Sequence, residues 1–265
     1  MIQVMTLNAA QAGPSIDSLR EPAGQGAIDL LCCQSLTHTP DGRVELRRQL
    51  SATLGLTCSC FVAGRPHPRS ASDGNTAGKG LATFTGSGVW VLNSGSFTVG
   101  EEDEETLVQF ALIRKYGASV LALNLHLGIS HQAQIRQLRD LFAHSLLREP
   151  YGAVALCADR TAVLTGKEWL GLTARSPYTL SRTPLTLTGG GLLGLLTARC
   201  PTVSAVIVRQ PDPILYPDAE QAPALPALTM TFEIQRIVAN RPNRPTFPLS
   251  FREQWLGYRE HRAFA

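Results

Sequence analysis

Apolar runs and helix-like patterns alternate along the first part of this chain. Ile2–Leu7 and Ala27–Cys33 are predicted strands, and the second is apolar throughout, which is typical of a strand buried on both faces. Gly42–Leu54 carries leucines spaced four residues apart, which predicts a helix with one apolar face. Thr57–Val62 is expected to be the next strand.

The remaining pattern continues as strands with two further helices. Asn93-Ser94-Gly95 is predicted to be a turn. Ser130 is the expected N-cap of the amphipathic helix His131–Leu147, and Thr165 opens a short helix through a capping box with Glu168. The further strands are expected to be two or three short strands within Gly80–Val99, a hairpin of Thr106–Arg114 and Ala118–Leu125, and the strands Val154–Cys157, Val203–Val208 and Ala227–Ile234. The glycine cluster Gly189–Gly194 is expected to form a turn or to allow close packing.

Composition favours one domain with a thick core. The chain has 265 residues, of which 44% are hydrophobic and 17% charged. This fits a four-layer α/β/β/α sandwich, in which two packed mixed sheets are flanked by helices. The net charge of +3 is too small to imply nucleic acid by itself. No apolar run approaches the roughly 18 residues of a membrane helix, and no leader pattern opens the chain, so we expect a cytoplasmic protein without a membrane partner.

The six cysteines predict buried thiols in a reducing compartment. Cys58 and Cys60 are separated by the period of a strand, which predicts that both lie on one face. A metal site would need a second such pair or nearby histidines, and His67 stands alone.

Polar residues stand at the ends of four predicted strands, in the segments Thr6-Leu7-Asn8, Cys32-Cys33-Gln34-Ser35, Asn124-Leu125-His126-Leu127 and Ala158-Asp159-Arg160-Thr161. In this order they resemble the L-N, Q-E, N-x-H-L and G-D-F-N segments of the endonuclease/exonuclease/phosphatase superfamily, the DNase I-like metal-dependent phosphodiesterases. The resemblance spans roughly residues 1–234. It implies the DNase I-like fold, with the four strand ends around one site.

The sequence departs from that family where the chemistry is done. Ser35 stands in place of the metal-binding Glu, Thr161 in place of Asn, and Pro223-Ala224 in place of the closing Asp-His pair. A further family Asp would fall near Ser204. Mg²⁺ and Mn²⁺ prefer carboxylate oxygens, and the Asp-His pair would supply general acid–base catalysis. The resemblance therefore implies a fold without a complete catalytic set.

Several residues remain candidates for a site. His126 and Asp159 are the residual catalytic candidates, and Asn8 is the candidate for binding a metal or its water, with Gln34 beside it. Each also has a structural interpretation, as a turn former, a hydrogen-bonded histidine or a cap. A relocated metal site would draw on other residues: His38, Asp41, Asp73 and the acidic run Glu101–Glu105, which otherwise reads as a solvated loop.

Two functions follow from this reading. The first is a catalytically degenerate binding or scaffold module without a cofactor. The alternative is a divergent phosphodiesterase, nuclease or phosphatase with a rebuilt Mg²⁺ or Mn²⁺ site. Residues 235–265 form an Arg-rich extension, in which Phe251, Trp255 and Tyr258 form an aromatic stripe. We expect this stripe to dock on the chain's own domain; the other interpretation is a tail for a protein or nucleic-acid partner.

Overall fold

The structure is a computed structural model with two β-sheets. It describes residues 1–9, 28–38, 45–64, 78–101, 105–149, 151–159, 164–174, 176–180, 185–186, 192–198, 205–209 and 227–235. Within these ranges one sheet has six strands and the other has seven. Ser204, the residues that precede the last predicted strand and the C-terminal aromatic stripe lie outside the described residues.

The six-stranded sheet, sheet A, brings the first and last described strands together. Its order is β12-β13-β1-β2-β4-β3. β1 pairs with β2 in parallel and with β13 in the antiparallel sense. The strands are β1 (Ile2–Asn8), β2 (Leu30–His38), β3 (Thr57–Ala63), β4 (Gly78–Thr85), β12 (Ala205–Arg209) and β13 (Ala227–Gln235).

The seven-stranded sheet, sheet B, follows the order β10-β11-β8-β7-β6-β5, and β9 also pairs with β11. β7 and β8 are its parallel pair. The strands are β5 (Trp90–Val99), β6 (Thr106–Lys115), β7 (Ala118–Leu125), β8 (Ala153–Ala158), β9 (Tyr178–Leu180), β10 (Leu185–Thr186) and β11 (Leu192–Ala198).

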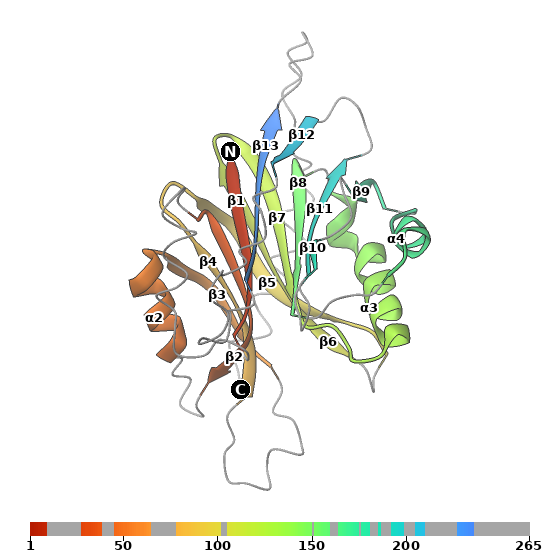
Figure 1. The fold of residues 1–265 in the computed structure, drawn as a ribbon, viewed down its shortest axis with the longest axis horizontal. Helices are drawn as coiled ribbons and strands as arrows, with labels where there is room; N and C mark the ends of the chain where they lie inside the picture. The colour runs from red at the N-terminus through yellow and green to blue at the C-terminus, as the bar shows by residue number, and fades with distance from the viewer. Residues whose placement is uncertain are drawn as a thin grey trace, which may run out of the picture.

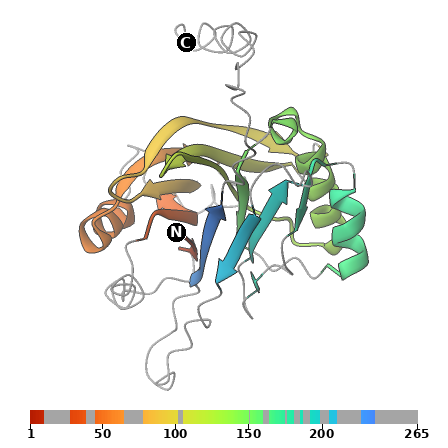
Figure 2. The ribbon, with the colours of Figure 1, turned by 90° about the horizontal axis from the view of Figure 1, so that it is seen from above.

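Helices cover the outer side of each sheet (Figures 1 and 2). α2 (Glu45–Leu54) packs on sheet A, whereas α3 (His131–Ala143) and α4 (Gly166–Thr173) lie beside sheet B. A short 3₁₀ helix, Ser145–Arg148, follows α3. This is the four-layer α/β/β/α sandwich that the sequence predicts. None of the described helices is long and apolar enough to cross a membrane.

Alternating side chains divide the core into the three interfaces of a four-layer sandwich. In β2, Leu30 and Cys32 point between the sheets, whereas Leu31 and Cys33 point toward α2. In β7, Val120 and its alternate neighbours face sheet A, while the leucines between them face α3. Between the sheets, alanines of β6, β7 and β8 pack among larger side chains such as Phe232 and Met230.

Two strand predictions are wrong in detail. β2 does not end near Cys33 but continues to His38 through a β-bulge between Cys33 and Leu36. Asn93-Ser94-Gly95 is not a turn, because it lies inside β5 and pairs with β6. A Cβ on Gly95 would come within 2.8 Å of the Phe110 ring, so this glycine serves close packing and not a change of direction.

The starts of α3 and α4 and the end of α2 at Leu54 lie where the sequence predicts them. The Ser130 side chain accepts a hydrogen bond from the Ala133 amide, and Thr165 and Glu168 form the capping box. The helix expected to reach Leu147 instead ends at Ala143, because His144 adopts an extended conformation and caps the 3₁₀ helix by accepting from the Leu146 amide.

The cysteine pair on β3 is split by a second bulge. Because the register shifts between Cys58 and Cys60, the two thiols do not share a face as predicted. Cys58 approaches Arg47 of α2, whereas Cys60 approaches Ser94 of sheet B. Partial burial raises the pKa of both thiols, so neither has the depressed pKa of a reactive cysteine.

Candidate functional site

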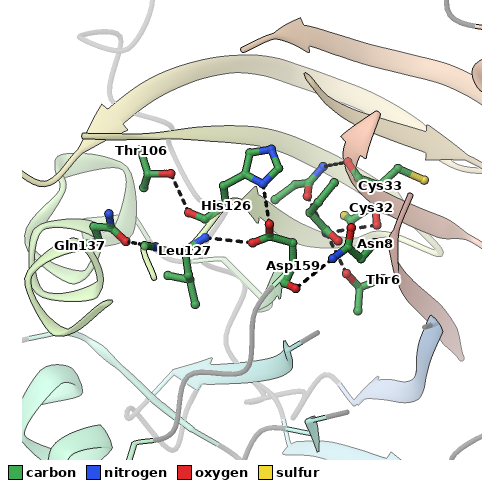
Figure 3. A network of polar contacts seen from close by, with 12 residues as sticks. Thr6, Asn8, Cys32, Cys33, Thr106, His126, Leu127, Gln137 and Asp159 are labelled. Atoms are coloured by element: carbon green, nitrogen blue, oxygen red, sulfur yellow. Dashed lines mark hydrogen bonds and ion pairs between the residues drawn. The ribbon is translucent and has the colours of Figure 1, made fainter. Parts of the chain in front are cut away.

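The carboxyl ends of two parallel strand pairs meet at one end of the sandwich. Asn8 ends β1 and lies opposite Gln34 of β2, and His126 and Asp159 directly follow β7 and β8. Asn8, His126 and Asp159 form what we call the strand-end cluster. The sequence predicts that these residues share a site, and the structure brings them together (Figure 3).

Asp159 is the centre of the strand-end cluster. Its Oδ2 lies 2.8 Å from Nδ1 of His126, and its Oδ1 accepts a hydrogen bond of 3.0 Å from the Leu127 amide. Its main-chain oxygen accepts from Nδ2 of Asn8 at 3.2 Å. Figure 3 shows Asp159 between these partners. Each carboxylate oxygen therefore has one hydrogen-bond partner within the protein.

The Asp159 carboxylate orients the His126 ring. A carboxylate accepts hydrogen bonds only, so Nδ1 of His126 carries the proton and Nε2 is left as the ring's other polar atom. The main-chain oxygen of His126 accepts from the Thr106 hydroxyl at 2.7 Å, which fixes the residue from β6. The imidazole side chain is 24% exposed, so its free edge reaches solvent.

A buried amide network lies beneath the strand-end cluster. It consists of Thr6, Gln34, Thr83, Gln109 and Asn124, all of them buried. Gln34 Nε2 donates to Thr6 Oγ1 and to Asn124 Oδ1, at 2.8 Å each. Gln109 Oε1 accepts from Thr83 Oγ1 at 2.7 Å and from Asn124 Nδ2 at 3.1 Å. The network links β1, β2 and β4 of sheet A to β6 and β7 of sheet B.

Asn124 also holds the bulge that carries Ser35. Its Nδ2 lies 3.1 Å from the main-chain oxygens of Cys33 and Ala82, the last regular pair before the bulge in β2. Ser35 follows with φ of 57°, in the left-handed region that residues other than glycine rarely adopt. The position that resembles the family's metal-binding Glu is thus a buried serine on a bulge fixed from the opposite sheet.

The sequence did not single out Gln109 or Asn124 as a pair. Both are single polar residues within otherwise apolar strands, and they face one another across the β6–β7 hairpin. That combination is the signal that could have found them, because a buried amide must be hydrogen-bonded.

The residues that the structure describes around the strand-end cluster do not by themselves fit a Mg²⁺ or Mn²⁺ site. Such ions require several oxygen ligands, usually including carboxylates. Asp159 is the single carboxylate of the cluster and already accepts from His126 and from the Leu127 amide, whereas Asn8 could offer only its neutral Oδ1, because its Nδ2 donates to the Asp159 main chain. Among the described residues, no group of three or more His, Cys, Asp or Glu side chains is placed to hold a metal.

Other sequence candidates lie away from the cluster or beyond the described chain. Glu101 and Glu105 are exposed where β5 connects to β6, which agrees with a solvated loop. His38 closes β2, and only its backbone is described. The positions that fall outside the described residues are Asp41, Asp73, Thr161, Pro223 and Ala224.

Comparisons with known structures give one fold. The human Nocturnin catalytic domain matches with a TM-score of 0.63 and 16% identity, over 88% of this chain and 94% of that one. An endonuclease/exonuclease/phosphatase from Bacteroides vulgatus matches at 0.57 and 16%, over 88% and 99%. The mannosyl-6-phosphatase Bt3783 of Bacteroides thetaiotaomicron matches at 0.56 and 13%, over 89% and 100%.

Sequence comparison adds no family beyond this. No protein-family model matches the chain, and no curated protein matches it. The structural matches cover nearly the whole length of each relative and agree with the two-sheet sandwich described above.

Proposed function

We propose, on the premise that this chain has the DNase I-like fold of the endonuclease/exonuclease/phosphatase superfamily, that it acts as a binding or scaffold module without hydrolytic activity. The observation that carries the proposal is that, among the described residues, no further His, Cys, Asp or Glu side chain joins Asp159 and His126 to form a metal site. Its two carboxylate oxygens are bonded to His126 and to the Leu127 amide. Each oxygen keeps a second lone pair, but Asp159 is the single carboxylate of the strand-end cluster, and Mg²⁺ or Mn²⁺ requires several oxygen ligands.

The sequence supports the same conclusion at the neighbouring position. A metal-dependent phosphodiesterase holds its ion on a phosphate oxygen and orients the attacking water. Ser35 stands where the resemblance places the family's carboxylate, and a neutral hydroxyl does not supply the charge that binds a divalent ion. Asp159 is then the single carboxylate that the strand-end cluster offers to an ion.

One observation favours the alternative of a divergent hydrolase. Asp159 and His126 form a carboxylate–imidazole pair in which Nε2 of the ring is left to meet a ligand. Such a pair can serve as a general base or can bind a phosphate oxygen when protonated. The alternative therefore predicts phosphodiesterase, nuclease or phosphatase activity that depends on His126.

Hydrolysis assays separate the two functions. The full chain would be tested on bis-p-nitrophenyl phosphate, p-nitrophenyl phosphate and single-stranded DNA with Mg²⁺ or Mn²⁺. We expect no turnover above that of His126→Ala prepared in parallel. Metal-dependent turnover that is lost in His126→Ala but kept in His131→Ala, an exposed histidine of α3, would overturn the proposal in favour of the hydrolase.

Titration calorimetry tests the metal premise directly. We expect no measurable binding of Mn²⁺ by the unmodified chain, and weak binding after Ser35→Glu combined with His126→Gln, which adds one carboxylate and releases an oxygen of Asp159. Tight Mn²⁺ binding by the unmodified chain would contradict the premise.

The location and partner of the chain are proposed on narrower grounds. A cytoplasmic location is supported by the five cysteines of the described chain, which are free thiols. The Arg-rich residues 235–265 are proposed to dock through their aromatic stripe or to recruit a protein or nucleic acid. Truncation of residues 247–265 distinguishes these, since docking predicts a lower melting temperature and partner recruitment predicts an unchanged one.

A further inference from the structure

Within the part of the chain that the structure describes, one edge of sheet B is unpaired and carries no charge. β5 pairs on one side with β6, and no strand of the described chain pairs with its other side. Figure 2 shows β5, in yellow, along the outer rim of the molecule. Edge strands expose unpaired amide and carbonyl groups, and proteins usually protect them with charges, prolines or short length.

β5 has none of these three protections, and the one protective device that it carries is a β-bulge near its start. Its ten residues, WVLNSGSFTV, include no charged residue and no proline. At its start Trp90 is 72% exposed, Val91 37% and Leu92 45%. The bulge between Val91 and Asn93 makes Leu92 the extra residue of this run. Three consecutive exposed apolar side chains on an uncharged edge strand form a surface suited to another strand.

The charges at the two ends of β5 indicate which strand would pair with its open edge. Trp90 pairs with Arg114, an exposed residue of β6, so the start of β5 is flanked by positive charge. The end of β5 leads through Gly100 into the acidic run Glu101–Glu105, whose described members are exposed. Ten residues of strand separate these opposite charges by about 30 Å. A second copy placed antiparallel would bring each basic end beside an acidic end.

We propose that β5 pairs antiparallel with β5 of a second copy of this chain, about a two-fold axis, to form a dimer with one continuous sheet. Two-fold pairing brings Arg114 of each copy toward Glu101 of the other, twice, and brings no charged residue of β5 against another. Trp90 and Leu92 lose exposed apolar area in this arrangement. The strand-end cluster is not part of the interface, so the proposal stands apart from the proposed function.

Sedimentation velocity of the full chain tests the dimer across a concentration series. We expect a species of about twice the 28.6 kDa chain mass, with a dissociation constant in the micromolar range typical of a small interface. Leu92→Lys should weaken association at least tenfold. Its matched control is Leu170→Lys on α4, because Leu170 is also a largely exposed leucine, and this variant should keep the dimer.

A charge-reversal variant tests the electrostatic contribution to the dimer. Arg114→Glu should weaken the dimer at low salt and less so at high salt, because screening reduces contacts between exposed charges. Lys167→Glu, which makes the same change of charge on exposed α4, should leave association unchanged. A chain that stays monomeric at all concentrations, or a dimer that survives Leu92→Lys unchanged, would overturn the proposal. Circular dichroism would establish that each variant is folded.

Discussion

Removing the Asn124 amide is expected to destabilise the whole sandwich, because this side chain connects the two sheets. Asn124→Ala deletes an acceptor for Gln34 Nε2 and a donor shared by three oxygens, on Cys33, Ala82 and Gln109. An amide nitrogen has two hydrogens, so two of those three contacts are strong at any time. The substitution therefore removes about three hydrogen bonds from a fully buried site.

The magnitude follows from the burial of the groups left behind. A net loss of about 1 kcal/mol for each bond gives about 3 kcal/mol, and unpaired buried groups cost more than the mean. Gln34 Oε1 already has no hydrogen-bond partner among the described residues, so Gln34 has little capacity to compensate. We expect a loss of about 3–5 kcal/mol, a large part of the roughly 5–15 kcal/mol that holds a domain folded.

Urea unfolding followed by far-ultraviolet circular dichroism measures the change. Asn124→Ala should lower the midpoint while the dependence on denaturant stays the same, as in a loss of native-state stability. Gln132→Ala removes an exposed amide from α3 and should change stability by less than about 0.5 kcal/mol. A loss below 1 kcal/mol for Asn124→Ala would refute the account of the buried amide network as the link between the sheets.

Three further changes test other parts of the structure by urea unfolding. Tyr178→Phe should lower the free energy of unfolding by about 1–3 kcal/mol, because the buried hydroxyl donates to the Glu149 main chain and accepts from the Tyr151 amide. Burial raises the pKa of this phenol to about 12, so the loss of stability should be constant between pH 6 and 9. Thr165→Ala should cost about 1 kcal/mol by removing the capping box of α4, and an unchanged midpoint would contradict that role. Burial lowers the pKa of His144 below 6.5, so the unfolded chain binds this proton more tightly and stability should fall as the pH drops below 6.5. His144→Gln should flatten this dependence of stability on pH. Parallel pH curves for the two proteins would contradict the assignment to His144.

The sequence predicts the layers of the sandwich well, because the spacing of apolar residues along the chain indicates which side chains are buried. The hairpin of β6 and β7 and the N-cap of α3 are close to their expected positions. Asn93-Ser94-Gly95 misleads because turn residues also suit a bulged edge strand, where Gly95 makes room for the Phe110 ring. β9 has only three residues, which is too short for periodicity to distinguish it from a loop. β11 begins inside the glycine cluster expected to be a turn or a packing site.

The candidate site is predictable in its location but not in its bonding. Strand ends in the order of a known family predict that Asn8, His126 and Asp159 meet, and the contacts among them confirm that they do. That Asp159 has both oxygens occupied depends on the Leu127 amide, a backbone group that no sequence motif reports. The link from Asn124 to Gln34 joins residues 90 positions apart in two different sheets, and local patterns carry no information at that separation.

The place of β13 has a consequence for how the chain is made. β13 lies between β12 and β1, so the first described strand waits for the last described strand before its outer edge is paired. About 220 residues separate them along the chain, which at roughly 5–20 residues per second is about 11–44 s of translation. Throughout that time β1 presents an apolar, unpaired edge on the nascent chain. Chaperones that hold exposed strand edges are therefore expected to engage this protein on the ribosome, and release after β13 emerges would mark the completion of sheet A.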